Sequence, residues 1–272
     1  MTATINGFPC TPLSPGALPM DFSGSTEYGY LTAEATQKHA IGRLCETWDG
    51  KRFRYSKAGT VALVQALMTQ GPVISAKQIG QVQTGYGAAV GAKDAIRCLV
   101  TTGGIAAAES WTFENALVGG ELVCHSVSPA VLGDTYTIVK SKMYSETLID
   151  IWIDRPIKTA IGATGLVSLL QPKFDRTIVV PVTTATALPA GVPRVPVLAG
   201  YYYWSQTKGP CPMIVDTGDT VVVGSKVGIP GTNAVAGACG VATATGFAFP
   251  IYGTCIQVSA ADTVALIDLE LE

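Results

Sequence analysis

The sequence predicts a mainly β protein, with a sandwich or barrel-like β body preceded by an extended, proline-rich N-terminal arm. Three observations predict this class. Short runs alternate between apolar and polar residues, as half-buried strands do. These runs are rich in Val, Ile and Thr and are separated by Gly, Pro, Asp or Ser. They recur at regular spacing, which is typical of sandwiches and barrels.

The arm is predicted for residues 1–37. This segment contains Pro9, Pro12, Pro15 and Pro19 and shows no apolar periodicity. Each proline removes a backbone donor and disfavours helix before it, so we expect extended chain. A disordered tail is the alternative. The β-rich body then covers residues 38–272.

Strands of period two fill most of the body. In residues 147–154, Ile149, Ile151 and Ile153 share one face, and Leu148, Asp150, Trp152 and Asp154 lie on the other. The last strand, 263–271, points Ile267 and Leu269 inward and ends the chain in a sheet. The other predicted strands are 94–102, 121–127, 135–142, 176–182, 213–216, 220–229 and 253–259.

Two segments do not fit the strand pattern. Residues 59–70 mix good helix formers with two valines and an initial glycine, so helix and strand are equally favoured. Residues 155–174 contain Pro156 and Pro172 and predict a short helical turn or an irregular crossover. This crossover is a candidate for dividing the body into two lobes near 155–175.

The surface predicted by the composition carries few charges. Charged residues make up 14% of the chain, against roughly 25% in an average soluble domain, and the mean hydropathy is +0.34. We therefore expect partner subunits to cover much of the exterior. The net charge of −2 and the absence of a basic run argue against direct nucleic-acid binding. The sequence shows neither a secretory signal at its start nor 18 consecutive apolar residues, so we expect no membrane association.

Metal, cofactor and catalytic sites are not predicted. The seven cysteines form no CxxC pair, and three of them, Cys98, Cys124 and Cys255, lie in apolar runs, where a free thiol acts as a small core residue. The two histidines, His39 and His125, lie 86 positions apart, outside any metal-ligand spacing, and His125 is predicted to face outward.

The stretch from Gly200 to Gly224 offers two tempting sites. Asp216-Thr217-Gly218 spells the tripeptide of aspartic proteases, but it occurs once, so catalysis would need a homodimer. A β-turn is the favoured interpretation. The aromatic run 201–204 alternates sides on a strand, which predicts one pair in the core and the other at a subunit contact. A sugar-stacking platform is the alternative, although only Gln206 lies in range to bind hydroxyl groups.

Two blocks resemble a pattern found in virion proteins of tailed bacteriophages. The first is 38–70, where Gln65-Ala66 stand in place of a glycine in that pattern; the second is 191–227. Between them, 118–141 resembles the hairpin of the same proteins. The matching positions in the first block are Gly50, Phe53, Tyr55, Ala58, Gly59 and Leu67. In the second block they are Tyr202, Trp204, Gln206, Gly209, Pro210 and Gly224.

The resemblance implies a structural virion protein, not an enzyme, that binds the outside of a phage capsid as a decoration or cement protein. Its implied partners are major capsid protein subunits and further copies of itself, a trimer being one candidate, with no cofactor. It would be made in the host cytoplasm and end on the capsid exterior. Another virion component, a carbohydrate-binding module or a dimeric Asp-Thr-Gly protease are the alternatives. We expect the subunit interface to use Phe8, Pro9, Pro12, Pro15, Tyr201 and Tyr203.

Overall fold

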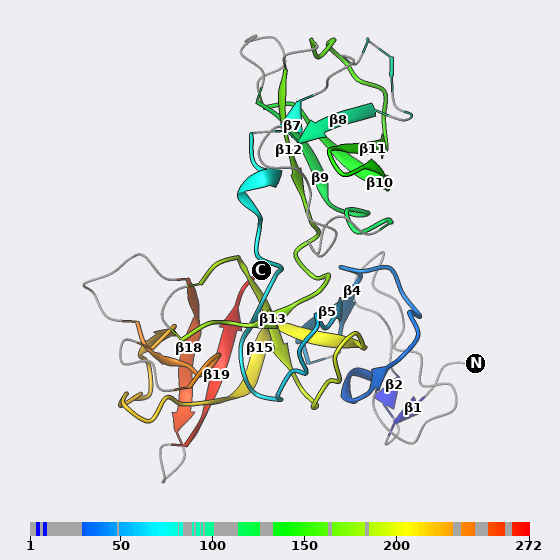
Figure 1. Cartoon of the computed structure of the whole chain (residues 1–272). Helices are drawn as coiled ribbons and strands as arrows, with labels where there is room; N and C mark the ends of the chain where they lie inside the picture. Colours follow the sequence, from blue (N-terminus) through cyan, green and yellow to red (C-terminus); the bar gives the residue numbers. More distant parts are fainter. Residues whose placement is uncertain are drawn as a thin grey trace. The chain divides into compact units, whose positions relative to one another are not determined.

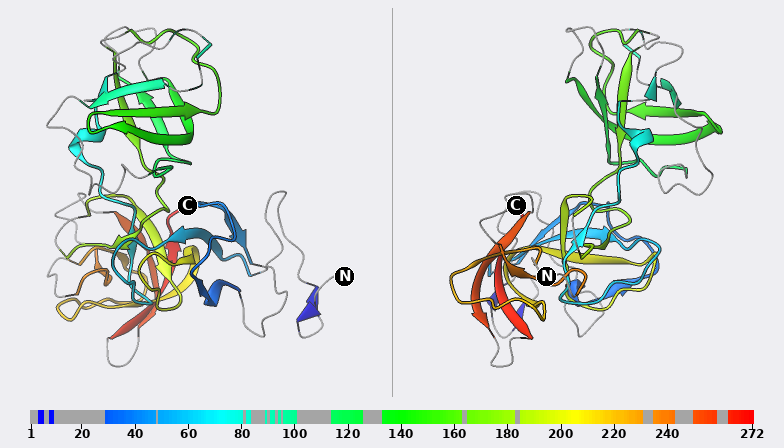
Figure 2. Two further views of the ribbon diagram at one scale, coloured as in Figure 1. Left: turned by 45° about the vertical axis from the view of Figure 1, so that its right-hand side comes forward. Right: turned by 60° about the vertical axis from the view of Figure 1, so that its left-hand side comes forward.

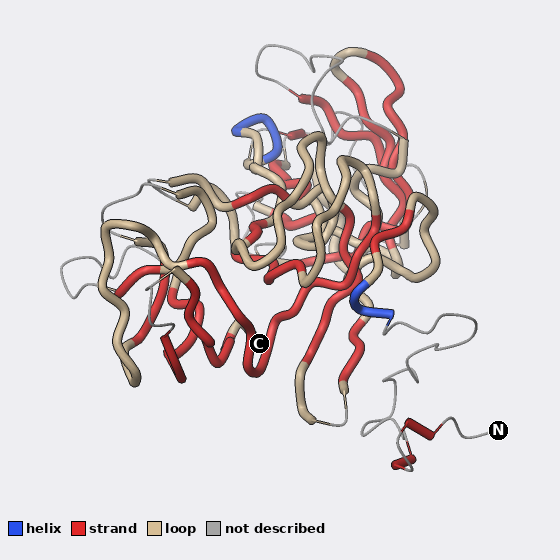
Figure 3. The backbone as a smooth tube through the Cα atoms, turned by 90° about the horizontal axis from the view of Figure 1, so that it is seen from below, coloured by secondary structure: helices blue, strands red, loops and turns tan. Residues whose placement is uncertain are grey.

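A computed structural model of the chain confirms the mainly β class (Figure 1). Helical structure in the described part of the chain is confined to two 3-10 turns, η1 (Gly29–Leu31) and η2 (Ala76–Gln78), as Figure 3 shows. The structure describes residues 4–5, 8–9, 29–47, 49–80, 82–83, 89, 91–92, 94, 96–100, 114–125, 133–162, 165–182, 185–230, 235–242, 250–258 and 263–272.

The chain divides into two compact units. Unit 1 contains residues 1–72 and 173–272, and unit 2 contains residues 73–172. The chain leaves unit 1 after strand β6 (Thr69–Gln70) and re-enters before β13 (Ile178–Val179), and these two strands pair with each other. A Cβ added to Gly71 would lie 2.9 Å from the carbonyl oxygen of Lys173. The outgoing and returning segments therefore lie side by side where they join unit 1.

Unit 1 is built on one curled antiparallel sheet with the strand order β13-β6-β14-β15-β19-β18-β16-β17. The longest strand, β15, pairs through its first half with β5 and through its second half with β19. Further strands join beside β15: β3 pairs with β15, and β4 pairs with β5. The bounds are β3 (Ala33–Glu34), β4 (Leu44–Glu46), β5 (Arg52–Lys57), β14 (Pro189–Pro193), β15 (Tyr202–Ile214), β16 (Lys226–Gly228), β17 (Gly240–Val241), β18 (Ile251–Val258) and β19 (Val264–Glu270).

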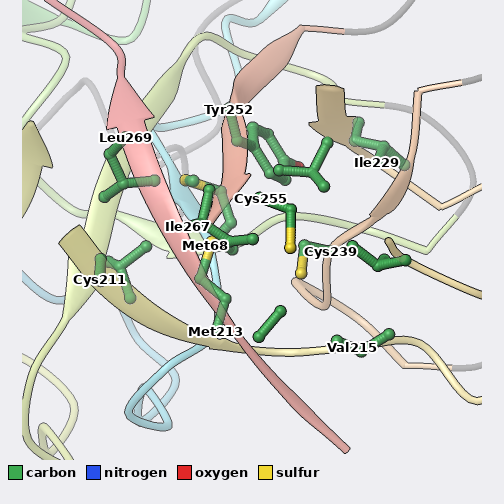
Figure 4. Close-up of a cluster of buried hydrophobic side chains, with 14 of the residues drawn as sticks. Met68, Cys211, Met213, Val215, Ile229, Cys239, Tyr252, Cys255, Ile267 and Leu269 are labelled. Atoms are coloured by element: carbon green, nitrogen blue, oxygen red, sulfur yellow. The ribbon is translucent and has the colours of Figure 1, made fainter. Parts of the chain in front are cut away.

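The curl of this sheet encloses the larger core of unit 1. An isolated bridge joins Val215 to Cys239, so the segment before β17 returns to the end of β15. Figure 4 shows the enclosed cluster, in which side chains from β15, β18 and β19 meet. Ile267 and Leu269 point into it with no exposed surface, as their alternation predicts, and Glu270 points out.

The start of the chain lies only partly within the described residues. β1 (Thr4–Ile5) and β2 (Phe8–Pro9) pair with each other, and continuous description begins at Gly29. Because β3 pairs with Tyr202 and Tyr203 of β15, residues 33–34 lie in the sheet of unit 1. That part of the segment assigned to the arm from sequence belongs to the sheet.

Unit 2 is a closed antiparallel barrel with the strand order β10-β11-β8-β7-β12-β9 (Figure 2). Ile149, Ile151 and Ile153 point into its core, as predicted, each no more than 3% exposed. Their polar neighbour Asp150 is also buried, because it accepts two hydrogen bonds from Arg97 at 2.7 and 3.0 Å. The bounds are β7 (Val82–Gln83), β8 (Ile96–Val100), β9 (Glu121–Cys124), β10 (Thr135–Ser145), β11 (Leu148–Ile153) and β12 (Leu166–Leu170).

The two ambiguous segments take forms that their composition does not fix. Residues 59–70 are neither a helix nor one strand: Leu63 bridges to Val197, a turn follows at Gln65-Ala66, and β6 comes last. Ala66 has a φ of 63°, in the left-handed region where glycine is favoured. In 155–174 the described residues are irregular up to Gly165, and β12 then follows.

Candidate functional site

Most of the residues that match the phage pattern lie on or beside the β5–β15 ladder, whereas Leu67 and Gly224 lie elsewhere in unit 1. Tyr55 lies opposite Trp204, and Phe53 lies opposite Gln206, although about 150 residues separate the two strands in sequence. Side chains on one strand alternate between faces, so each of these pairs occupies one face of the sheet. Both blocks therefore contribute to a single local structure, the β5–β15 site.

Aromatic rings cover one face of this site. The ring of Tyr55 lies 5.1 Å from that of Trp204, 5.9 Å from that of Tyr202 and 5.1 Å from that of His39. Lys57 lies over the ring of Tyr202 at 5.2 Å. Tyr55 is buried, whereas Tyr202 and Trp204 are partly exposed. Because Tyr55 also accepts a hydrogen bond from the backbone of Lys38, it fixes the entry of the chain into this layer.

Two glycines and a phenylalanine shape the β5 side. Gly50 has a φ of 81° in the turn between β4 and β5, a conformation that favours glycine. Phe53 is fully buried, and the ring of Tyr30 stacks on it at 4.7 Å. Gly59 donates from its backbone to Thr177 at 2.8 Å, and an added Cβ would meet that residue's carbonyl oxygen at 3.2 Å. The small residue permits this close approach.

Gln206 holds a bend in β15. Its side chain is fully buried, and its Nε2 lies 3.0 to 3.2 Å from the carbonyl oxygens of Lys208, Gly209 and Pro210. Its Oε1 accepts a hydrogen bond from Arg194 at 2.6 Å. The register between β15 and β5 shifts here, and Gly209 adopts a φ of 83°. The Gln-x-x-Gly-Pro pattern thus encodes a bend, and Gln206 is not available to bind a sugar.

The structure corrects the prediction for Tyr203. This residue is 1% exposed, and its hydroxyl lies 2.9 Å from the hydroxyl of Thr177. Burial raises the pKa of the Tyr203 hydroxyl. Tyr201 is partly exposed and packs against the small buried cluster that contains Tyr203, Leu63 and Val197. Tyr203 is therefore a core residue with no side-chain surface for a partner, and Tyr202 and Trp204 are the pair on the partly exposed face.

The arm residues chosen from the sequence are only partly described. Phe8 and Pro9 form strand β2. Pro12 and Pro15 lie outside the described residues. Their assignment to a subunit interface stays a prediction.

Asp216 forms part of a turn, as its local sequence predicts. Thr217 and Gly218 form the turn, and the backbone of Asp219 donates to the carbonyl oxygen of Asp216 at 3.1 Å. The Asp216 carboxylate is 1% exposed and accepts a hydrogen bond from the backbone of Val235 at 2.8 Å. A carboxylate at the axis of a dimeric protease must be open to substrate, and this one is enclosed by its own loop.

The six described cysteines are buried free thiols. Cys98, Cys124 and Cys255 act as small core residues, as predicted. Cys211, Cys239 and Cys255 share the core in Figure 4 with two methionines. Burial raises the pKa of the Cys98 and Cys239 thiols to about 12, so these thiols stay protonated and unreactive.

Other features give weaker candidates. His125 is exposed, as predicted, and His39 packs into the aromatic layer. A shallow cleft of about 530 Å³ on unit 2 includes Tyr136, Arg155 and Lys158, and the guanidinium of Arg155 lies over the Tyr136 ring. The described residues contain no cluster of three potential metal ligands. None of the helices among them is long and apolar enough to cross a membrane.

One exposed surface was not singled out from the sequence. Leu63 and Val197 exchange two backbone hydrogen bonds, at 2.8 and 2.9 Å, and point their side chains inward. Their neighbours point outward, and the exposed residues of 60–65 and 196–200 form what we call the uncharged surface. Val61, Val64 and Leu198 are 64%, 51% and 60% exposed there. The sequence does contain a signal for this surface, because residues 58–72 and 195–207 contain no charged residue.

The polar side chain of Gln206 in the β5–β15 site is used within the chain, and the partly exposed side chains of the site include the aromatic Tyr202 and Trp204. Comparison with protein-family models, with curated proteins and with solved structures finds no match to this chain.

Proposed function

We propose that this chain is a structural virion protein that binds the outside of a phage capsid and stabilises the head against the pressure of packaged DNA. Its partners are major capsid protein subunits and other copies of itself, and it has no catalytic role. The observation that carries the proposal is the β5–β15 site. Two sequence blocks that resemble phage virion proteins contribute opposite strands of one ladder, with Trp204 on Tyr55 and Gln206 on Phe53.

Several of the matching residues have a physical role there. Gly50 makes the turn into β5, Gly59 permits a close backbone approach, and Gln206 holds the bend at Gly209 and Pro210. A chance similarity of short motifs would not be expected to select positions that depend on one another. These residues belong to one folded substructure, and we take the resemblance as a guide to function.

The surface also suits a protein that works through contact area. A cement protein stabilises a shell by adding interfaces that must break before the shell opens. About 800 Å² per partner is typical of a stable contact, and repetition over a symmetric lattice multiplies modest contacts. The partly exposed aromatic side chains of Tyr202 and Trp204 provide such area.

Co-sedimentation tests the proposal. Shells assembled from the major capsid protein encoded in the same genome are mixed with increasing amounts of the purified protein and pelleted. We expect saturable pelleting and a higher temperature of shell disruption. Shells that are already saturated provide the control for non-specific pelleting. If the folded protein stays in the supernatant at all concentrations, the proposed function is wrong.

A further inference from the structure

The uncharged surface of unit 1 carries several exposed apolar side chains together with the uncharged polar residues Thr60 and Gln65. It lies on two antiparallel segments, so Val64 faces Pro196 and Ala62 faces Leu198 across the Leu63–Val197 bridge. Exposed apolar side chains gathered in this way mark interaction sites more often than scattered ones do. Residues 58–72 and 195–207 contain no charged side chain, so a partner that binds them desolvates no charge in these segments.

The beginning of the chain has matching chemistry. Residues 1–20 contain no charged residue, and the first is Asp21. Apolar side chains such as Phe8, Leu13 and Leu18 are interspersed with four prolines in this segment. Proline restricts the free chain, so ordering such a segment on a surface costs less conformational entropy than ordering an ordinary one. Contact between two uncharged surfaces also avoids the desolvation of ions.

The chain enters unit 1 at a distance from the uncharged surface. β3 runs antiparallel to β15, with Glu34 opposite Tyr202 and Ala33 opposite Tyr203. Followed towards the N-terminus, the chain moves away from Gly200, and Tyr30 stacks on Phe53, which pairs with Gln206. The arm therefore leaves about 20 Å along β15 from the uncharged surface, heading away from it. Residues 10–28, which connect the β1–β2 hairpin to unit 1, span up to about 65 Å when extended. This length reaches the surface of a neighbouring copy as well as that of the same copy, and the trapping experiment below decides between the two.

We propose that residues 1–20 of one copy bind the uncharged surface of a second copy and so link copies into a homo-oligomer. The contact joins two different surfaces, so it is heterologous and closes into a ring when the rotation between copies permits. This inference deepens the proposed association of the chain with copies of itself by naming the two surfaces that meet, and it does not depend on shell binding. The association is measured without any shell present, so its failure and the failure of shell binding are separate results.

Sedimentation velocity tests the association. We expect the full chain to form one defined oligomer and a variant lacking residues 1–20 to be monomeric. Leu198→Glu places a charge in the contact and is expected to weaken association at least about tenfold. Val223→Glu is the matched control, because Val223 is also exposed, at 64%, and lies outside the uncharged surface. Circular dichroism confirms that each variant is folded. A monomeric full chain, or an oligomer that survives removal of residues 1–20, overturns the proposal.

Disulfide trapping tests which copy is bound. The six described cysteines are buried, and Cys10 lies within residues 1–20. Val61→Cys places a thiol on the uncharged surface, and Val223→Cys is the matched control, since both valines are 64% exposed. Mild oxidation is expected to join Cys10 of one copy to position 61 of another, giving cross-linked chains on a non-reducing gel.

Three other outcomes of the trapping experiment contradict the proposal. A disulfide between Cys10 and position 61 of the same chain, identified by mass spectrometry of a band of single-chain mass, shows that the arm folds back on its own copy. Cross-linking that persists in Val61→Cys after Cys10→Ser shows that two surfaces meet directly. Equal yields from Val61→Cys and Val223→Cys show unspecific collision. Each of these results rejects the proposed binding of residues 1–20 to the uncharged surface of a second copy.

Discussion

Replacing Gln206 with leucine removes the side chain that holds the bend in β15 while keeping a similar volume. The change removes the acceptor that Arg194 uses at 2.6 Å and the Nε2 group that lies within 3.2 Å of three carbonyl oxygens. Nε2 has two hydrogens, so the three contacts together count as about two hydrogen bonds. No comparable donor is left inside the bend at Gly209 and Pro210.

The expected loss is about 3 to 4 kcal/mol. A hydrogen bond to a charged group contributes about 1.5 kcal/mol at the low end, which suits the partly exposed Arg194, and each neutral bond contributes about 1 kcal/mol. This is a large part of the roughly 5 to 15 kcal/mol that stabilises an ordinary domain. In a unit of this size it corresponds to a fall in Tm of about 10 °C.

Urea unfolding followed by pulse-labelling hydrogen exchange and mass spectrometry separates the two units, because each is observed through its own peptides. We expect peptides of unit 1 to unfold at lower urea in Gln206→Leu, and those of unit 2 to be unchanged. Gln257→Leu is the matched control, since Gln257 is exposed on β18 and should change stability by less than about 0.5 kcal/mol. If Gln206→Leu costs no more than Gln257→Leu, the backbone holds the bend without the amide and the reasoning is wrong.

Three further predictions concern single sites in the described chain. Ala66→Gly is expected to raise the stability of unit 1 in urea by up to about 1 kcal/mol, because Ala66 has a φ of 63°, whereas Ala62→Gly should lower it. Burial raises the pKa of the Cys98 and Cys239 thiols from 9.0 to about 12, so the folded state retains protons that the unfolded state releases; stability is full below pH 9 and is expected to fall as the pH rises towards 12 in alkaline unfolding followed by circular dichroism. Asp216→Ala removes a buried acceptor and is expected to cost about 1 to 3 kcal/mol in urea unfolding, whereas Asp216→Asn keeps an oxygen there and should cost less.

Much of the fold was predictable because alternation is a local signal. The inward faces of Ile149, Ile151 and Ile153, and of Ile267 and Leu269, follow from the period of two alone. The turn at Thr217-Gly218 follows from residues that favour turns wherever they occur. In these segments local preference and tertiary structure agree.

Other features depend on which strands pair, and local sequence does not encode pairing. Nothing in residues 73–172 alone shows that six strands close into a barrel, because closure depends on contacts such as β9 with β10 and β12. Tyr203 was assigned to the wrong environment because alternation separates two faces without saying which is the core. Gln206 was predicted to be a motif residue, but its hydrogen bonds to the backbone around Gly209 follow only from the folded chain.

The attachment of unit 2 has an evolutionary consequence. Because β6 and β13 are paired neighbours and Gly71 approaches Lys173, the two junctions occupy the position of a hairpin loop. Unit 2 is therefore inserted at a position where a hairpin would have a short loop. Such a module can be lost, duplicated or exchanged for another without rethreading the host sheet, and the same position is suited to displaying a foreign domain.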